Sequence, residues 1–302
     1  MPRVSKKLIN STVYFFDTRE HAKGGEEGFL GGGFISGRLY KGVDIFFVLT
    51  AGHVISTDKL PVMRINTNDG NFEIYEVTSS NLHMSDDYDL AIIDVDLPDE
   101  RHDVAAVSTQ AYVFPEDEKG PSMWGLAPGV DTFMVGRFAV IDEALVNTPA
   151  LRFGNISTMP VSIKMHRFPI RQDCYCVDMH SRPGYSGSAV FAYRTLMDND
   201  FGFDVSDPKP EKASFFGLLG VHLGQLREDW DVGDDIEETI VVKENGRKIS
   251  GMSGMAIVLP ARSLLKELKK PEIQEFHDKY VRDHVAKYGK PSPVALEEES
   301  KN

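Results

Sequence analysis

The stretch Leu49-Thr-Ala-Gly-His53-Val-Ile55 places a histidine directly behind an apolar run, Ile45-Phe-Phe-Val-Leu49. The run is rich in β-branched and aromatic residues, which is typical of a buried strand. His53 is therefore expected at the end of that strand. An imidazole has an unperturbed pKa of about 6.5 and exchanges a proton near neutral pH. This makes His53 a candidate general base.

Two patterns further along the chain supply partners for a base. Asp89 directly precedes a second apolar run, Leu90-Ala-Ile-Ile93, and Ser186 lies in Gly184-Tyr-Ser-Gly-Ser188, before a third. A serine hydroxyl needs an adjacent base to become nucleophilic, and a buried carboxylate fixes the tautomer of the imidazole. Glycines let the backbone turn tightly and direct N–H groups at a developing oxyanion. The three patterns predict acyl transfer by a triad of His53, Asp89 and Ser186.

The chain order of these motifs is histidine, aspartate, serine, as in the chymotrypsin class, and not that of α/β-hydrolases or subtilisins. T-A-G-H at 50–53, D-L-A at 89–91 and G-Y-S-G-S at 184–188 resemble the trypsin-like (chymotrypsin-fold) serine peptidases, in particular their bacterial trypsin-like peptidase domains. Glycine-containing strands in the same order, at 31–35, 152–157, 216–224 and 254–260, resemble the family too. The resemblance implies that the backbone N–H groups of Gly184 and Ser186 form the oxyanion hole.

The texture of the chain agrees with an all-β fold. Short β-rich runs alternate with Gly, Asn and Asp, and Asn68-Asp-Gly-Asn71 and Asn245-Gly246 are typical hairpin turns. Such spacing predicts sandwiches or barrels. The resemblance implies two six-stranded antiparallel β-barrels with a C-terminal helical tail.

We predict four segments. Residues 1–115 form the barrel with the histidine and the aspartate, and 116–128 form a Pro- and Gly-containing linker. Residues 129–262 form the barrel with the serine and the substrate strand, and 263–302 form the tail. Pro271 predicts a kink or two short helices within the tail.

Composition excludes several classes of function. Among 302 residues, 46 are acidic and 33 basic, for a net charge of −13, which argues against binding to nucleic acid or to an anionic membrane. No apolar run approaches the roughly 18 residues of a membrane span, and no apolar region follows the basic N-terminus, so we expect no signal peptide. Cys174 and Cys176 fit free thiols in a reducing compartment, and a lone C-x-C does not make a zinc site. We therefore expect a cytoplasmic protein without metal or cofactor.

Competing residues exist for two of the roles. Asp103, in His102-Asp-Val-Ala, also fits the acid, but Asp89 precedes the stronger apolar run and is closer to the family's spacing from the histidine. Ser253 lies in Gly251-Met-Ser-Gly-Met255, which imitates the nucleophile turn. Only one strand and the helical tail follow it, so we expect a hairpin residue.

The segment Asp198–Asp204 resembles a calcium loop. It lacks the glycine at the sixth position and the glutamate at the twelfth. We therefore predict that it is a surface insertion between strands.

The resemblance also bears on the substrate. The pocket base of trypsin-like enzymes lies six residues before the nucleophile, which is His180 here, so no acid is present to bind Lys or Arg. Ser181 and His222 resemble the substrate-binding pair of glutamyl endopeptidases and of Gln-selective viral proteases. We predict a polypeptide substrate with Glu or Gln at P1 (the residue on the acyl side of the cleaved bond), bound by His180, Ser181, His222 and Gly224. The acidic run 228–238 near the cleft favours Gln.

Tyr185 occupies the position of the aspartate that pairs with the new N-terminus in zymogen-activated trypsins. A tyrosine cannot make that ion pair. We therefore expect activity without N-terminal cleavage, or control by another route.

Two other functions fit parts of the pattern, namely a catalytically idle peptide-binding module and a serine esterase. The complete set of His53, Asp89 and Ser186 with Gly184 and Gly187 favours an enzyme. The strand at 219–224 can pair with an extended peptide, which favours a peptidase. The sequence does not indicate an oligomeric state.

Overall fold

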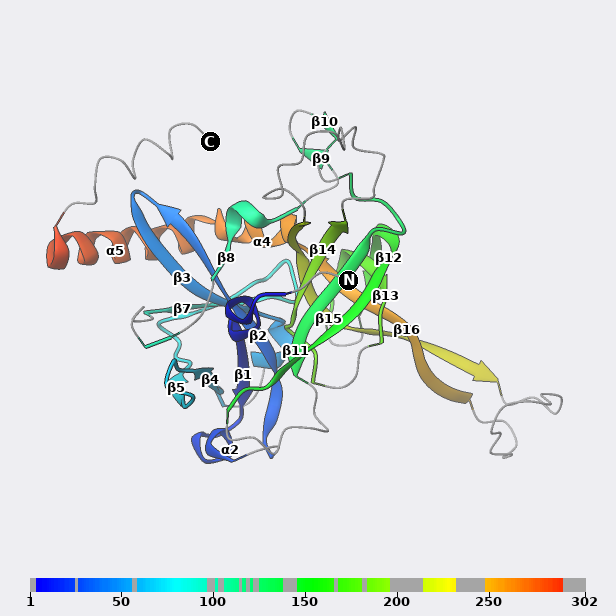
Figure 1. The fold of residues 1–302 in the computed structure, drawn as a ribbon, viewed down its shortest axis with the longest axis horizontal. Helices are drawn as coiled ribbons and strands as arrows, with labels where there is room; N and C mark the ends of the chain where they lie inside the picture. Colours follow the sequence, from blue (N-terminus) through cyan, green and yellow to red (C-terminus); the bar gives the residue numbers. More distant parts are fainter. Residues whose placement is uncertain are drawn as a thin grey trace.

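The computed structural model (Figure 1) places most of the chain in β-strands. It describes residues 4–24, 27–55, 59–96, 101–102, 106–113, 116–117, 120–121, 125–137, 146–165, 168–180, 184–195, 214–231 and 248–289. Within these residues two large sheets and a C-terminal pair of helices make up most of the fold. This agrees with the predicted fold class.

The N-terminal part is an eight-stranded sheet. Seven strands follow the order β5-β4-β1-β2-β3-β7-β6, and β8 pairs with β2. The strands are β1 (Thr12–Phe16), β2 (Phe29–Tyr40), β3 (Val43–Thr50), β4 (Val62–Asn66), β5 (Phe72–Glu76), β6 (Leu82–Met84), β7 (Ala91–Val95) and β8 (Val107–Ser108). Three short helices accompany them: α1 (Lys6–Asn10), α2 (Arg19–Lys23) and α3 (Gly52–Ile55).

This sheet differs from the predicted six-stranded barrel in being open between β5 and β6. The physical reason lies in the two edge strands. Neither has a fully buried residue in the structure, whereas every residue of β7 is buried. Closing a barrel requires its edge strands to pair along their length. Here β6 is only three residues long, and side chains such as Tyr75 and Leu82 pack against the core while remaining partly exposed.

The C-terminal part is the six-stranded closed barrel that the sequence predicts. Its strands follow the order β11-β12-β13-β16-β15-β14. They are β11 (Asp131–Arg137), β12 (Pro149–Lys164), β13 (Arg171–Asp178), β14 (Ala189–Thr195), β15 (Ser214–Asp231) and β16 (Lys248–Pro260). A small hairpin, β9 (Glu116–Asp117) with β10 (Gly120–Pro121), and the turn η1 (Thr109–Ala111) lie between the two parts in the chain.

One apolar core joins the two sheets. The largest cluster of buried side chains contains Phe47 and Leu90 of the N-terminal sheet together with Phe133, Phe191 and Leu223 of the barrel. Burying aromatic and aliphatic side chains on both sides of a contact stabilises it by about 1.5–3 kcal/mol per side chain. The core thus fixes how the two sheets face each other.

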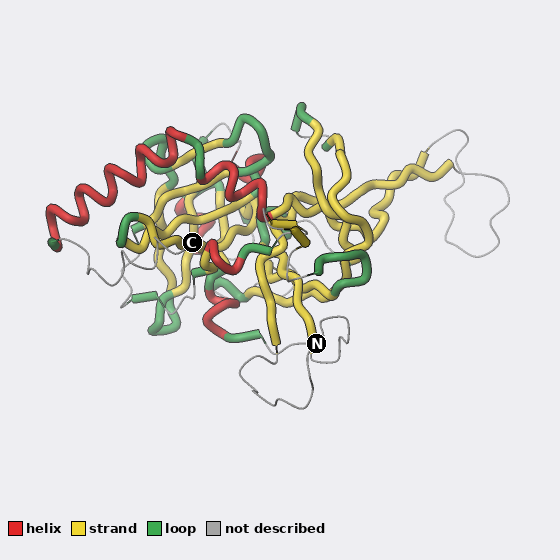
Figure 2. Tube along the Cα trace, turned by 90° about the horizontal axis from the view of Figure 1, so that it is seen from above, coloured by secondary structure: helices red, strands yellow, loops and turns green. Residues whose placement is uncertain are grey.

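The tail forms two helices, α4 (Ala261–Leu268) and α5 (Pro271–Tyr288), divided at the proline that predicted the break. Leu264 and Leu268 of α4 are buried. Figures 1 and 2 show α5 running away from the barrel along the N-terminal sheet, while the β15–β16 hairpin extends on the opposite side. No helix in the described residues is long and apolar enough to cross a membrane.

Polar contacts anchor α5 to the N-terminal sheet. The buried His277 has Nε2 3.0 Å from Asp94 Oδ1 of β7, and Tyr40 donates to Asp278 at 2.9 Å. At the junction between the helices, Lys270 pairs with Asp87, just before the predicted catalytic aspartate, at 2.8 Å. The tail therefore packs on the same sheet that carries His53 and Asp89.

Candidate active site

The structure brings His53 and Asp89 together at the ends of two paired strands. His53 lies in α3, directly after β3, and Asp89 lies in the turn before β7, with Thr50 and Ala91 opposite each other in the ladder. Asp89 accepts the backbone N–H of His53 on Oδ1 at 2.8 Å and faces Nδ1 with Oδ2 at 2.7 Å. A carboxylate opposite Nδ1 places the ring proton there, which leaves Nε2 as the basic nitrogen.

The neighbourhood of this pair is tightly packed. The side chain of Asp89 is 1% exposed and that of His53 is 10% exposed. A Cβ at Gly52 would come within 3.0 Å of Asp89 Oδ1 and of the Leu90 nitrogen. The absence of a side chain at Gly52 thus leaves room for the Asp89 carboxylate to accept the backbone N–H of His53 at the start of α3.

Ser186 comes from the barrel, in the turn between β13 and β14. Gly184 and Gly187 have φ angles of +100° and +84°, a region that suits glycine and strains other residues. The carbonyl of Ser186 accepts the N–H of Gly32 in β2 at 2.8 Å, and Gly187 donates to the carbonyl of His222 at 2.8 Å. The turn is therefore anchored to both sheets.

The hydroxyl of Ser186 donates a long hydrogen bond, 3.5 Å, to the carbonyl of Leu223. Within the described chain, no hydrogen bond joins it to His53. Several contacts nevertheless bring the two motifs together: Gly187 packs against Thr50, and a Cβ at Gly31 would meet both Val54 and the Ser186 carbonyl. Nucleophile–base bonds are often long without substrate, so this arrangement suits a serine–histidine pair before substrate arrives.

The predicted oxyanion hole has the required free donors. In the part of the chain that the structure describes, neither the N–H of Gly184 nor that of Ser186 donates a hydrogen bond. Between them, Tyr185 is fully buried and its hydroxyl accepts a hydrogen bond from Arg152 Nε at 3.2 Å. Two backbone N–H groups from one fixed turn are what stabilises a tetrahedral oxyanion.

The predicted substrate-binding residues differ in their placement. His180 is exposed after β13, whereas His222 of β15 is 1% exposed and lies with Nδ1 3.0 Å from the Tyr185 carbonyl. Gly224 follows at a register shift in β15, half-buried, beside Met165. Ser181 lies outside the described residues.

Burial sets the charge of His222. It lowers the pKa of this imidazole to about 4, against the opposing effect of the hydrogen bond to Tyr185 and with a further lowering by the charge of His53. The ring is thus neutral at neutral pH. Since a carbonyl only accepts, the proton of the neutral ring lies on Nδ1.

Of the residues that compete for roles in the site, the structure describes only Ser253. Asp103 and the segment Asp198–Asp204 lie outside the described residues. Ser253 lies in β16, donates to the Leu226 carbonyl at 3.1 Å and accepts the N–H of Met255 at 3.2 Å. This hydroxyl serves the β15–β16 hairpin, as we predicted.

One residue of the site has no signal in the sequence. Gln172 of β13 accepts the backbone N–H of Asp89 on Oε1 at 2.8 Å, across 83 residues of chain. A contact of that separation leaves no local pattern.

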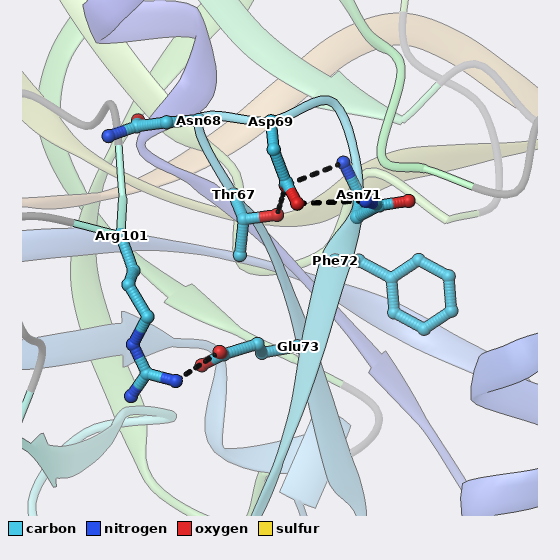
Figure 3. A pocket seen from close by; sticks show the side chains of 7 residues that line it. All are labelled: Thr67, Asn68, Asp69, Asn71, Phe72, Glu73 and Arg101. Carbon is cyan, nitrogen blue, oxygen red and sulfur yellow. Dashed lines mark hydrogen bonds and ion pairs between the residues drawn. The ribbon is translucent and has the colours of Figure 1, made fainter.

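A separate hollow at the β4–β5 turn contains none of the predicted residues (Figure 3). Its polar groups bind one another: Asp69 accepts from Thr67 and Asn71, and Arg101 pairs with Glu73 at 2.6 Å. The described residues contain no cluster of three or more His, Cys, Asp or Glu side chains arranged to hold a metal ion.

Comparison with known proteins now bears on the fold. No family model and no curated protein sequence matches the chain. The crystal structure of the MamO protease domain from Magnetospirillum magneticum matches with a TM-score of 0.52 over 88% of this chain and 100% of that one, at 13% identity. The chain has the trypsin-like serine protease fold.

The HtrA-type protease AlgW, crystallised with a tripeptide, is similar at a TM-score of 0.47 and 14% identity, over 94% of this chain and 62% of that one. In this structure, His53, Asp89 and the turn of Ser186 lie at the contact between the N-terminal sheet and the barrel. The likeness concerns the fold, and the chemistry has to be argued from the site itself.

Proposed function

We propose that the protein is a serine endopeptidase with a His53–Asp89–Ser186 triad. The observation that carries this proposal is the pair of hydrogen bonds that Asp89 accepts from His53, next to a serine turn anchored on both sheets. Each element of acyl transfer has a group in place: a nucleophile, a base with a fixed tautomer, and two backbone donors for the oxyanion.

In the proposed reaction, Ser186 Oγ attacks the peptide carbonyl while His53 Nε2 takes up the hydroxyl proton. The carbonyl oxygen becomes an oxyanion and binds the N–H groups of Gly184 and Ser186. The tetrahedral intermediate collapses, His53 returns the proton to the leaving amine, and an acyl-enzyme remains. His53 then takes a proton from water, whose oxygen attacks the ester carbonyl. The bond from that carbon to Ser186 Oγ breaks, His53 returns the proton to Oγ, and the acid product and free Ser186 result.

An extended peptide suits the strand next to the serine turn. β14 pairs with β15 only as far as Val221, and His222 bonds to the turn at residues 187 and 188. Beyond His222, the described ladder of β15 is with β16 alone, so its other edge faces the turn without a strand partner. Such an edge binds a peptide by strand addition, which favours a peptidase over an esterase for small acyl groups.

The state of His222 refines the proposed P1 preference. We expected this residue to bind Glu or Gln as a hydrogen-bond donor. With its proton on Nδ1, toward the Tyr185 carbonyl, the neutral ring has an unprotonated Nε2, which accepts a hydrogen bond and suits the N–H of a carboxamide. The ring offers neither a proton nor a positive charge to the carboxylate of Glu, and burying an unpaired carboxylate is costly. An uncharged carboxamide avoids that cost. We therefore propose Gln in preference to Glu at P1.

A fluorophosphonate probe tests the proposed reaction directly, because it reacts with an activated serine. Wild type should label, Ser186→Ala should not, and Ser253→Ala should label as wild type does. Absence of labelling in the folded wild type would contradict the enzyme and leave the peptide-binding module. A P1-diversified peptide library should then show the preference for Gln; cleavage after Lys, Arg or large apolar residues would contradict it.

A further inference from the structure

We propose that Gln172 is a positioning residue, through which the barrel fixes the acid of the triad on the opposite sheet. This inference rests on the proposed function, because it assigns to Asp89 the role of the acid. It concerns a residue that touches neither substrate nor His53. Its effect on catalysis would therefore be exerted through Asp89 alone.

The contact is short and buried, and it joins the two halves of the molecule. Gln172 lies near the start of β13, is 3% exposed, and accepts the N–H of Asp89 on Oε1 at 2.8 Å. Asp89 belongs to the turn before β7 of the N-terminal sheet. A buried hydrogen bond of this kind has strict geometry, so it restricts where the Asp89 backbone sits relative to the barrel.

The turn itself provides acceptors for four of its other backbone N–H groups. Ser85 donates its N–H to the Leu90 carbonyl and accepts those of Asp87 and Tyr88 on its hydroxyl, and Leu90 donates to the Tyr88 carbonyl. Among the described bonds of this turn, only that of the Asp89 N–H reaches the other sheet. Without Gln172 this buried donor would be unsatisfied, which costs about 1–3 kcal/mol.

Of the two polar atoms of the Gln172 amide, only the oxygen makes a hydrogen bond in the described structure. The amide Nε2 is buried and has no hydrogen-bond partner in the described structure. A buried donor without a partner is unfavourable, so an apolar side chain would fill this space at lower cost if packing were the only role. The hydrogen bond from the Asp89 N–H to Oε1 is the one described interaction of this side chain that needs a polar group.

A second buried side chain lies on the same face of β13. Cys174 is two positions further along the strand, and burial raises the pKa of its thiol to about 12. Of these two buried neighbours, Gln172 is the one that is hydrogen-bonded to Asp89.

The bond to Gln172 also affects where the His53 ring lies. Both carboxylate oxygens of Asp89 are occupied by His53, so a shift of the Asp89 backbone moves the imidazole with it. A misplacement of about 1 Å in a catalytic group can lower the rate about 100-fold. Gln172 thus makes the alignment of the triad depend on the contact between the sheets.

Gln172→Met provides the test, with kinetics on a cleaved peptide and with fluorophosphonate labelling. The substitution keeps the length of the side chain and removes the acceptor; we expect kcat to fall by about 10–100-fold, with little change in KM. Equal rates for wild type and Gln172→Met would overturn the inference.

The split between kcat and KM separates positioning from a loss of packing. Cys174→Ala is the matched control, because it removes a buried neighbour on the same strand without touching the bond from Asp89 to Gln172. It should lower the free energy of unfolding and leave kcat at the wild-type value; a similar fall in kcat in both variants would overturn the inference.

Hydrogen exchange keeps this test independent of activity. In Gln172→Met, the amides of residues 85–90 should exchange at least 10-fold faster than in wild type, while Cys174→Ala should leave them protected. A wild type that fails to label would overturn the proposed function. Unchanged exchange in Gln172→Met would show that the hydrogen bond from the Asp89 N–H to Gln172 does not hold the turn. Labelling by wild type together with wild-type kinetics in Gln172→Met would overturn this inference alone.

Discussion

Asp89 holds His53 at two points, with Oδ1 2.8 Å from the backbone nitrogen and Oδ2 2.7 Å from Nδ1. One oxygen thus fixes the start of the α3 helix and the other fixes the ring. The carboxylate is 1% exposed, so water does not compete for either bond. This relationship makes the identity of the acid testable by a single-atom change.

Asp89→Asn replaces one carboxylate oxygen by an amide of the same shape. An amide nitrogen facing Nδ1 favours the wrong tautomer, and we expect kcat to fall by about 10⁴-fold, the loss known for the same change in a Ser-His-Asp triad. The measurement is turnover of a peptide together with the rate of fluorophosphonate labelling. Asp87→Asn is the matched control, since Asp87 is two residues away and its side chain is 61% exposed; it should retain wild-type rates. Full activity in Asp89→Asn with loss in Asp103→Asn would transfer the role to Asp103.

Gly187 and Gly70 form a second matched pair, because their φ angles are +84° and +82°. A Cβ at Gly187 would collide with the Gly32 carbonyl and the Thr50 hydroxyl, whereas nothing lies within 4 Å of one at Gly70. Gly70→Ala should cost about 1–2 kcal/mol of stability from backbone strain alone. Gly187→Ala adds overpacking between the sheets and should cost about 3–5 kcal/mol.

Urea unfolding measures both stabilities, and labelling reports on the serine turn. Gly70→Ala should label at the wild-type rate, because its turn lies away from the site. Gly187→Ala should label at least 10-fold more slowly even under conditions where it is folded. Equal losses of stability in the two variants would mean that the turn of Ser186 is not wedged against β2 and β3.

The parts of this molecule that the sequence predicted are those with a local cause. His53 and Asp89 are marked by the buried strands beside them, and Ser186 by its glycines, so both the pairing of the first two and the tight turn of the third could be anticipated. The barrel, too, follows from strands with apolar faces. The open N-terminal sheet was missed, because closure depends on whether two edge strands pair along their length.

Contacts between distant segments could not be predicted from one sequence. Gln172 stands in Arg171-Gln-Asp173, which differs in nothing from an exposed strand start. The neutral state of His222 likewise depends on burial under residues remote in the chain. The local sequence G-V-H-L-G is compatible with a charged ring and with a neutral ring.

The buried His222 makes stability depend on pH in a defined window. Its pKa is lowered from 6.5 to about 4 in the folded chain, so between these values the unfolded chain binds a proton that the folded chain does not. Stability therefore rises with pH across this window and levels off above it. The difference between the two pKa values corresponds to about 3 kcal/mol.

His222→Gln removes this titration while keeping a donor for the Tyr185 carbonyl. The loss of unfolding free energy between pH 7.5 and pH 4 should be about 3 kcal/mol smaller in the variant than in wild type. Urea unfolding at the two pH values measures it. His180→Gln, at an exposed histidine, should keep the wild-type dependence; the same dependence in His222→Gln would show that the ring is not held neutral.

Tyr185 and Arg152 together hold the turn that carries the predicted oxyanion hole. The ring of Tyr185 is fully buried, and a Cβ at Gly136 would come within 2.6 Å of its Cδ1. Its hydroxyl accepts from Arg152 Nε at 3.2 Å. The oxyanion turn is thus held by a side chain of its own, and its shape does not require a newly made N-terminus. Full-length protein should label with fluorophosphonate as fast as protein trimmed by limited proteolysis.

Two variants separate the ring of Tyr185 from its hydroxyl. Tyr185→Phe keeps the ring against Gly136 and loses the acceptor, so it should cost about 1 kcal/mol of stability and label within about threefold of wild type. Tyr185→Ala leaves a cavity costing about 3–5 kcal/mol and frees the turn, so labelling should nearly vanish under conditions where the protein remains folded. Labelling that appears only after trimming, or that survives unchanged in Tyr185→Ala, would mean that something other than this ring shapes the oxyanion hole.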